Sequence, residues 1–184
     1  MTQSFEPNPQ PQQALATSGS MPINRDAAIA ELTRRMKSGA NNYYWIAALS
    51  VINSILSMTG SSTYFVIGLA ATLIVDGLTV GVSESLPDAS VIVKIIGLLL
   101  SIVIAGIFAL FGYFASQGKR WAFLVGMVLY GVDGLIMLAF ADWIGVLFHT
   151  FFLWGLFGGF RALNELQKIL SQKHMGFPEN IGVQ

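Results

Sequence analysis

Between residues 63 and 163 the sequence is a nearly continuous series of apolar runs, and this feature decides which folds the chain can adopt. Of the 184 residues, 54% are hydrophobic and 11% are charged, whereas soluble domains use about 25% charged residues. A chain of this composition belongs to the membrane class. The runs do not alternate apolar with polar residues as barrel strands do. We therefore expect helices, which satisfy their own backbone hydrogen bonds in lipid.

The pattern predicts an all-α, polytopic membrane protein with five apolar helices in a membrane domain at 41–166. The helices are expected at about 43–58, 63–83, 90–116, 121–140 and 143–163. A full span needs about 20 apolar residues, so the first segment, which contains Asn53 and three serines, is marginal. The ends are polar: the Pro-, Gln- and Ser-rich residues 1–22 predict a disordered tail, and 167–184 a polar C-terminal tail.

Residues 23–40 predict an amphipathic helix that ends at Gly39. Its basic residues suit a helix at the membrane surface that contacts anionic headgroups; they are Arg25, Arg34, Arg35 and Lys37. A solvated linker helix is the alternative interpretation.

The distribution of basic residues bears on topology. Four basic residues precede the first apolar segment, two lie between the third and fourth segments, and three lie at or after the end of the fifth. The tenth, Lys94, lies near the start of the third segment. If all five segments cross, the two sides hold 5 and 5; if 43–58 does not cross, they hold 9 and 1. Because basic residues favour the cytoplasmic side, we expect four crossings, with both termini cytoplasmic and 43–58 interfacial, re-entrant or partly inserted. Five crossings remain the alternative.

Two short motifs recur in the same order. The letters VDGL occupy 75–78 and 132–135, and each copy is followed by LFGxF, at 110–114 and 156–160. Residues 63–116 and 121–163 are therefore predicted to be two tandem transmembrane hairpins, an internal repeat of the kind some transporters use. Chance similarity between apolar stretches is the alternative.

Three stretches of this chain, "YYWIAALSVINSI", "VIGLAATLIVDGL" and "KRWAFLVGMVLYGVDGL", resemble a group of small bacterial multi-pass membrane proteins that is uncharacterised. The resemblance covers roughly residues 40–166. It implies location and architecture, and no activity.

A few polar side chains lie within the apolar segments: Asp76, Asp133, His149, Lys94 and Asn53. An ionisable group in a bilayer costs about 2.5–3.5 kcal/mol on insertion scales and usually faces the bundle interior. Counting residues from the segment ends places Asp133 level with His149, and Asp76 within reach of Lys94. Each hairpin is therefore predicted to pair a carboxylate with a base. Such a pair either fixes helix register or titrates in a proton or ion path.

Small residues at four-residue spacing predict close helix packing. They are Gly77, Gly81, Gly97, Ser101, Ala105, Ala109, Gly155 and Gly159. We expect them in the intramolecular core; a homodimer face is the alternative.

The sequence contains no cysteine and two histidines, and its net charge is zero. These counts exclude thiolate chemistry and give no basis for a catalytic residue, a metal site, a cofactor or a nucleic-acid partner. Ser101 with His149 lacks any nucleophile motif. We expect a non-catalytic accessory or interaction subunit of the bacterial cytoplasmic membrane, in contact with the bilayer and with a membrane-protein partner or a second copy. The alternative is a small transporter or channel with an Asp/His/Lys polar path.

Overall fold

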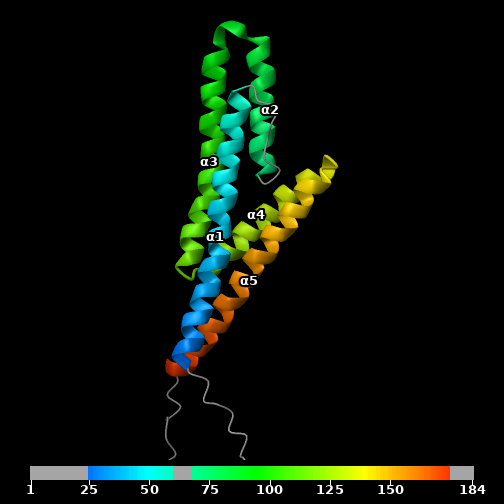
Figure 1. The fold of residues 1–184 in the computed structure, drawn as a ribbon. Helices are drawn as coiled ribbons and strands as arrows, with labels where there is room; N and C mark the ends of the chain where they lie inside the picture. Colours follow the sequence, from blue (N-terminus) through cyan, green and yellow to red (C-terminus); the bar gives the residue numbers. More distant parts are fainter. Residues whose placement is uncertain (1–24, 60–67, 175–184) are drawn as a thin grey trace, which may run out of the picture.

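The computed structural model describes residues 25–59 and 68–174, and this part of the chain is helical with no strand (Figure 1). The helices are α1 (Arg25–Met58), α2 (Ala70–Ser85), the 3₁₀ helix η1 (Pro87–Ala89), α3 (Ser90–Ser116), α4 (Arg120–Ala139) and α5 (Trp143–His174). The predicted all-α class is confirmed. The predicted tail at 1–22 lies outside the described residues.

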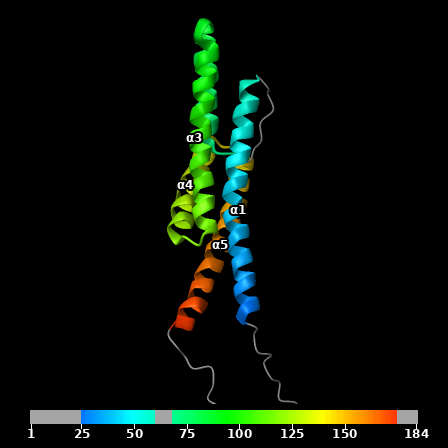
Figure 2. The ribbon, with the colours of Figure 1, turned by 90° about the vertical axis from the view of Figure 1, so that its left-hand side faces the viewer.

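Helix α1 is a single rod of 34 residues that packs along both α3 and α5 (Figures 1 and 2). The predicted end at Gly39 is wrong, because the helix continues through this residue into the segment at 43–58. Gly39 serves packing instead: a Cβ atom there would collide with the backbone of Gly159 in α5. The surface helix and the first apolar segment are therefore one element.

The other boundaries agree with the pattern to different degrees. Helices α3 and α4 lie within one residue of the predicted 90–116 and 121–140. Helix α5 runs on to His174, so part of the predicted polar tail at 167–184 is helical. Helix α2 begins only at Ala70, which makes it 16 residues long, and part of its predicted range, 63–67, lies outside the described residues.

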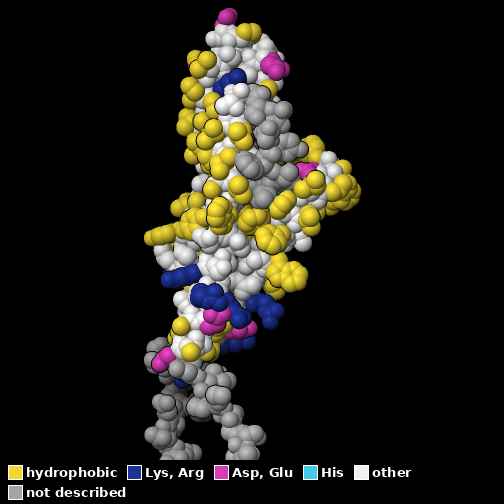
Figure 3. All heavy atoms as spheres, viewed as in Figure 1, with side chains coloured by type: hydrophobic (Ala, Val, Ile, Leu, Met, Phe, Trp, Pro, Cys, Tyr) yellow, Lys and Arg dark blue, Asp and Glu magenta, His cyan; other side chains and the backbone are white. Residues whose placement is uncertain are grey.

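Basic side chains concentrate in one part of the molecule. Lys and Arg side chains gather in a band across its lower part, where the N-terminal half of α1, the C-terminal half of α5 and the α3–α4 turn lie (Figure 3). The exposed acids Glu84 and Asp88 lie at the opposite end, at the α2–α3 turn. Exposed aromatic side chains occur near the basic band, among them Tyr44, Trp45, Tyr113 and Trp121. This order, basic residues next to aromatic ones, is typical of a membrane interface.

An aromatic cluster joins α1, α3 and α4 in the core. Tyr43 is fully buried between the rings of Phe111 and Phe123. Its hydroxyl donates a hydrogen bond to the Phe123 carbonyl at 3.0 Å. The cluster fixes α1 against the start of α4, where Gly126 leaves room for the Tyr43 ring.

The small residues divide into packed and open positions. On α3, Gly97, Ser101 and Ala105 are buried and Ala109 is partly buried against the core; a Cβ at Gly97 would overlap Thr79 of α2. On α5, Gly155 lies under Asn42 and Gly159 under Gly39. The expectation is wrong for Gly77 and Gly81, which are exposed with open space around them.

Candidate functional site

Asp133 of α4 is buried, with 4% of its surface exposed, and its carboxylate caps the first turn of α2. The backbone N–H of Ala70 donates to Oδ2 at 2.8 Å, and that of Ala71 donates to Oδ1 at 2.9 Å. A helix N-terminus has unpaired N–H groups and a partial positive charge. The carboxylate therefore satisfies two donors and places its charge where the helix dipole stabilises it.

Helix α2 depends on these distant acceptors because its own sequence supplies none. The N-cap residue is Leu69, whose side chain cannot accept a hydrogen bond. The Leu69 N–H donates instead to Ser50 Oγ of α1 at 2.9 Å. Side chains of α1 and α4 thus replace the Ser, Thr, Asp or Asn that usually caps a helix from within its own chain segment.

His149 of α5 completes the arrangement and is only 2% exposed. Its Nε2 lies 2.9 Å from Asp133 Oδ2, and its Nδ1 lies 2.8 Å from the carbonyl oxygen of Gly145. A carbonyl oxygen only accepts, so Nδ1 carries a hydrogen. The Nε2–Oδ2 contact then holds one further proton, on either the imidazole or the carboxylate, and the pair is neutral overall in both forms.

Packing holds the imidazole in this place. The Tyr130 ring stacks on it, with centroids 4.4 Å apart and planes 17° from parallel. A Cβ at Gly134 would lie 3.2 Å from the His149 side chain, so glycine leaves room for it beside α4. The predicted pairing of Asp133 with His149 is therefore present in the structure, and the glycine of the second VDGL motif has a packing reason.

Asp76 has different partners from those predicted. Ser54 Oγ of α1 donates to its Oδ2 at 2.8 Å, and Ser101 Oγ of α3 donates to its Oδ1 at 2.9 Å. The carboxylate is 6% exposed. The predicted partner, Lys94, is half-buried in the second turn of α3 and forms no ion pair with Asp76. The cause is depth: Ser101 is level with Asp76, and Lys94 lies seven residues nearer the α2–α3 turn, which is about 10 Å of helix rise.

The remaining polar candidate also lies at this level of the bundle. Asn53 is 1% exposed, and its side chain packs against Gly68, directly before α2. Ser50, Asn53 and Ser54 of α1 thus face the start of α2 and Asp76. The sequence analysis named Asn53 as a candidate but not Ser50 and Ser54. Ser50 lies three and four residues before Asn53 and Ser54, so the three polar residues share one face of an otherwise apolar helix, and this spacing could have identified them.

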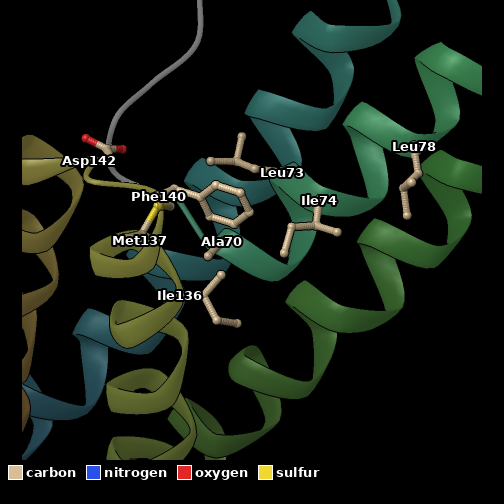
Figure 4. A pocket seen from close by; sticks show the side chains of 8 residues that line it. All are labelled: Ala70, Leu73, Ile74, Leu78, Ile136, Met137, Phe140 and Asp142. Atoms are coloured by element: carbon tan, nitrogen blue, oxygen red, sulfur yellow. The ribbon is translucent and has the colours of Figure 1, made fainter.

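An apolar groove of about 490 Å³ lies beside this site, between α2 and α4 (Figure 4). Figure 4 shows the Phe140 ring near the first turn of α2, with Leu78 at the far end of the groove. Asp142 lies at the groove, and its Oδ1 accepts the Gly145 N–H, which caps α5. Asp133 is not one of the eight residues that line the groove.

The chemistry available here is limited. In the described part of the chain, every buried side-chain nitrogen and oxygen has a hydrogen-bond partner. The same residues form no group of three or more His, Asp or Glu that could hold a metal ion. The site can hold one proton and lock helices together.

Three helical stretches are long and apolar enough to cross a membrane: Pro87–Ser116, Arg120–Ala139 and Trp143–Gln172. With the buried polar network and the apolar outer surface, they define the class: this is an α-helical membrane protein. Comparison with protein-family models, with curated proteins and with solved structures found no match.

Proposed function

We propose that the chain is a non-catalytic, multi-pass accessory subunit of the bacterial cytoplasmic membrane. The observation that carries this proposal is the use of both buried carboxylates as links between helices. Asp133 joins α4 to α2 and α5, and Asp76 joins α2 to α1 and α3. Groups whose oxygens are already occupied by fixed partners hold a scaffold together, whereas a transport path needs ionisable groups that exchange partners with water.

The paired ends of α1 and α5 support a partner-binding role. The N-terminal turns of α1 and the C-terminal turns of α5 lie at the same end of the molecule and diverge toward their tips (Figures 1 and 2). The Arg25 guanidinium donates to the Ile169 carbonyl at 2.6 Å and ties these ends together. A charged pair of helix ends joined by such a contact is a suitable binding surface for another protein.

The proposed topology adds α1 to the three apolar stretches of α3, α4 and α5, which makes four crossings and places both termini on the cytoplasmic side. Helix α2 is the re-entrant segment, because it begins beside the buried Asp133 and ends at the same turn from which α3 starts. This arrangement keeps the 9-to-1 distribution of basic residues, but the segment that does not cross is the second rather than the first.

Single cysteines test the topology cleanly because the chain has none of its own. Ala30→Cys, Asp88→Cys and Gln117→Cys place a thiol at exposed positions of α1, η1 and the α3–α4 turn. A membrane-impermeant maleimide should label 30 and 117 from the same side and 88 from the other. Thr59→Cys, at the exposed residue after α1, should be labelled from the same side as 88; labelling from the side of 30 would show that residues 43–58 do not cross. Labelling of 30 and 117 from opposite sides would disprove the topology.

The accessory role is tested in the native membrane. Tagged at its native expression level and extracted in mild detergent, the chain should migrate in an assembly larger than its own 19.9 kDa plus micelle. A photocrosslinker at Ala30 should capture one defined protein, and one at Asp88 should serve as the control. Migration as a free monomer, with no product specific to position 30, would contradict the proposal.

The transporter alternative predicts proton flux, which can be measured with the reconstituted protein. In sealed vesicles with a pH-sensitive dye inside, the accessory proposal expects wild-type chain and Asp133→Asn to leak protons no faster than empty vesicles. A wild-type flux that Asp133→Asn abolishes would favour the transporter instead.

A further inference from the structure

Two hollows meet on the face between α1 and α5. The first, of about 290 Å³, lies at the basic band and is lined by Arg34, Arg35 and Ser38 of α1 and by glycines of α5. The second, of about 540 Å³, is apolar and is lined chiefly by Leu147, Phe151 and Trp154. Asn42 and Gly155 line both, so the two form one continuous groove with a charged end and an apolar body.

Glycines shape the charged end. Gly155, Gly158 and Gly159 lack side chains, so the floor of the hollow is α5 backbone. Gly39 lies directly on Gly159, which brings the two helices into backbone contact there. Gly158 has open space above it. A ligand can therefore approach α5 closely beneath the two arginines.

The arginines keep free donors. Glu31 accepts two hydrogen bonds from Arg34 and one from Arg35, at 2.7–2.9 Å. A guanidinium has five N–H donors, so in the described part of the chain three on Arg34 and four on Arg35 are left for other acceptors. The three charges sum to +1, and both arginine side chains are largely exposed, at 74% and 65%. This surplus suits a phosphate group, which guanidinium forks bind well.

We propose that this groove binds one anionic phospholipid of the surrounding bilayer, with its phosphate at Arg34 and Arg35 and an acyl chain along Phe151 and Trp154. The distance fits: Gly159 and Phe151 are eight residues apart on α5, which is about 12 Å of helix rise. Charge complementarity selects an anionic headgroup, and the adjoining apolar body selects a lipid over a free phosphate ion. The proposal goes beyond the accessory role and does not depend on it.

Trp154 is the natural reporter, since it is 80% exposed and lines the apolar body. The other three tryptophans, Trp45, Trp121 and Trp143, are replaced with Phe. The full chain is then reconstituted in phosphatidylcholine vesicles that contain either brominated phosphatidylglycerol or brominated phosphatidylcholine as quencher. Quenching gives the relative affinity of Trp154 for the two lipids, and the neutral quencher also reports whether each variant is inserted.

We expect the anionic lipid to be preferred about five-fold or more, as roughly one well-placed net basic charge supports. Arg34→Ala with Arg35→Ala should abolish the preference, while Lys119→Ala with Arg120→Ala, on the α3–α4 turn, should retain it. Glu31→Gln should raise the preference, because it removes the acidic competitor for both guanidiniums.

Three results would overturn the proposal: equal quenching by both lipids, a preference that survives loss of Arg34 and Arg35, or one that is lost equally with Lys119 and Arg120. Inorganic phosphate at constant ionic strength should not reduce quenching by phosphatidylglycerol. If it does, the site binds a free anion and the lipid proposal is wrong. None of these results bears on the search for a protein partner at Ala30.

Discussion

Replacing Asp133 with alanine removes its side of three hydrogen bonds at once. The Ala70 and Ala71 N–H groups lose their cap, and His149 Nε2 loses its partner. Interhelical hydrogen bonds in membranes contribute about 0.6 kcal/mol each on average, so three amount to about 2 kcal/mol. Buried donors left unpaired add to this loss. We expect the free energy of unfolding to fall by about 2–4 kcal/mol.

Asparagine at the same position should cost much less. Its amide oxygen still accepts one backbone N–H of α2. Its NH₂ group can donate to His149 Nε2, which is a bare acceptor when Nδ1 carries the ring hydrogen and donates it to Gly145. One hydrogen bond of the three is then lost, at about 1 kcal/mol. A free energy of unfolding that falls from wild type to Asp133→Asn and again to Asp133→Ala thus tests the hydrogen-bond assignment rather than the charge alone.

Steric trapping in bicelles measures these free energies, and hydrogen exchange reports the location of the change. The amides of Ala70 and Ala71 should exchange faster in Asp133→Ala than in wild type, while amides in the middle of α3 should change little. Asp88→Ala, at an exposed acid in η1, is the matched control and should stay within about 0.5 kcal/mol of wild type. Equal losses for Ala and Asn, or unaltered exchange in the first turn of α2, would refute the capping argument.

Other positions give further tests. Asp76→Ala should cost about 1 kcal/mol in the same trapping assay, less than Asp133→Ala, because its serine partners can turn to helix carbonyls of their own; a larger loss would contradict this. Gly39→Ala should destabilise by about 1–3 kcal/mol, because its Cβ meets Gly159, whereas Gly77→Ala, in open space, should stabilise by about 0.5–1 kcal/mol. Hydrogen bonds from Arg34 and then Arg35 lower the pKa of Glu31 from 4.5 to about 2. A lowered pKa gives stability that is present above the pKa of the unfolded chain and is lost as pH falls through the pKa of the folded chain. The carboxyl carbon signal of Glu31 should titrate near pH 2. A midpoint near 4.5 would contradict the ion pairs.

The sequence predicted those features that depend on neighbours along the chain. Helices α3 and α4 were placed within one residue because each is an unbroken apolar run between polar turns. Asp133 and His149 were paired correctly because a short turn joins their helices. In such a hairpin, the rise per residue alone sets the depth of each side chain.

Features that depend on distant segments could not be read in this way. The cap of α2 lies 62 and 63 residues away from the amides that it satisfies. Gly39 resembles a helix stop until its contact with Gly159 is known. The spacing of Gly77 and Gly81 predicts a close-packed stripe, but spacing does not say whether that stripe faces a helix or lies open. Lys94 was matched to Asp76 by counting from the expected segment ends, but the packing of α2 on α3 places Asp76 level with Ser101, about 10 Å of helix rise from Lys94.

The proposed topology and the one expected from the sequence give the same distribution of basic residues. The basic residues favour four crossings and place 9 of 10 on one side, whichever of the first two apolar segments fails to cross. The stretch between those segments, residues 59–69, contains no Lys or Arg, so moving it across the membrane changes neither total. We propose α2 as the segment that does not cross because of the acceptors for its first turn. A helix that begins next to a buried carboxylate requires a start inside the bundle, and α2 has that start while α1 continues unbroken from Arg25 to Met58.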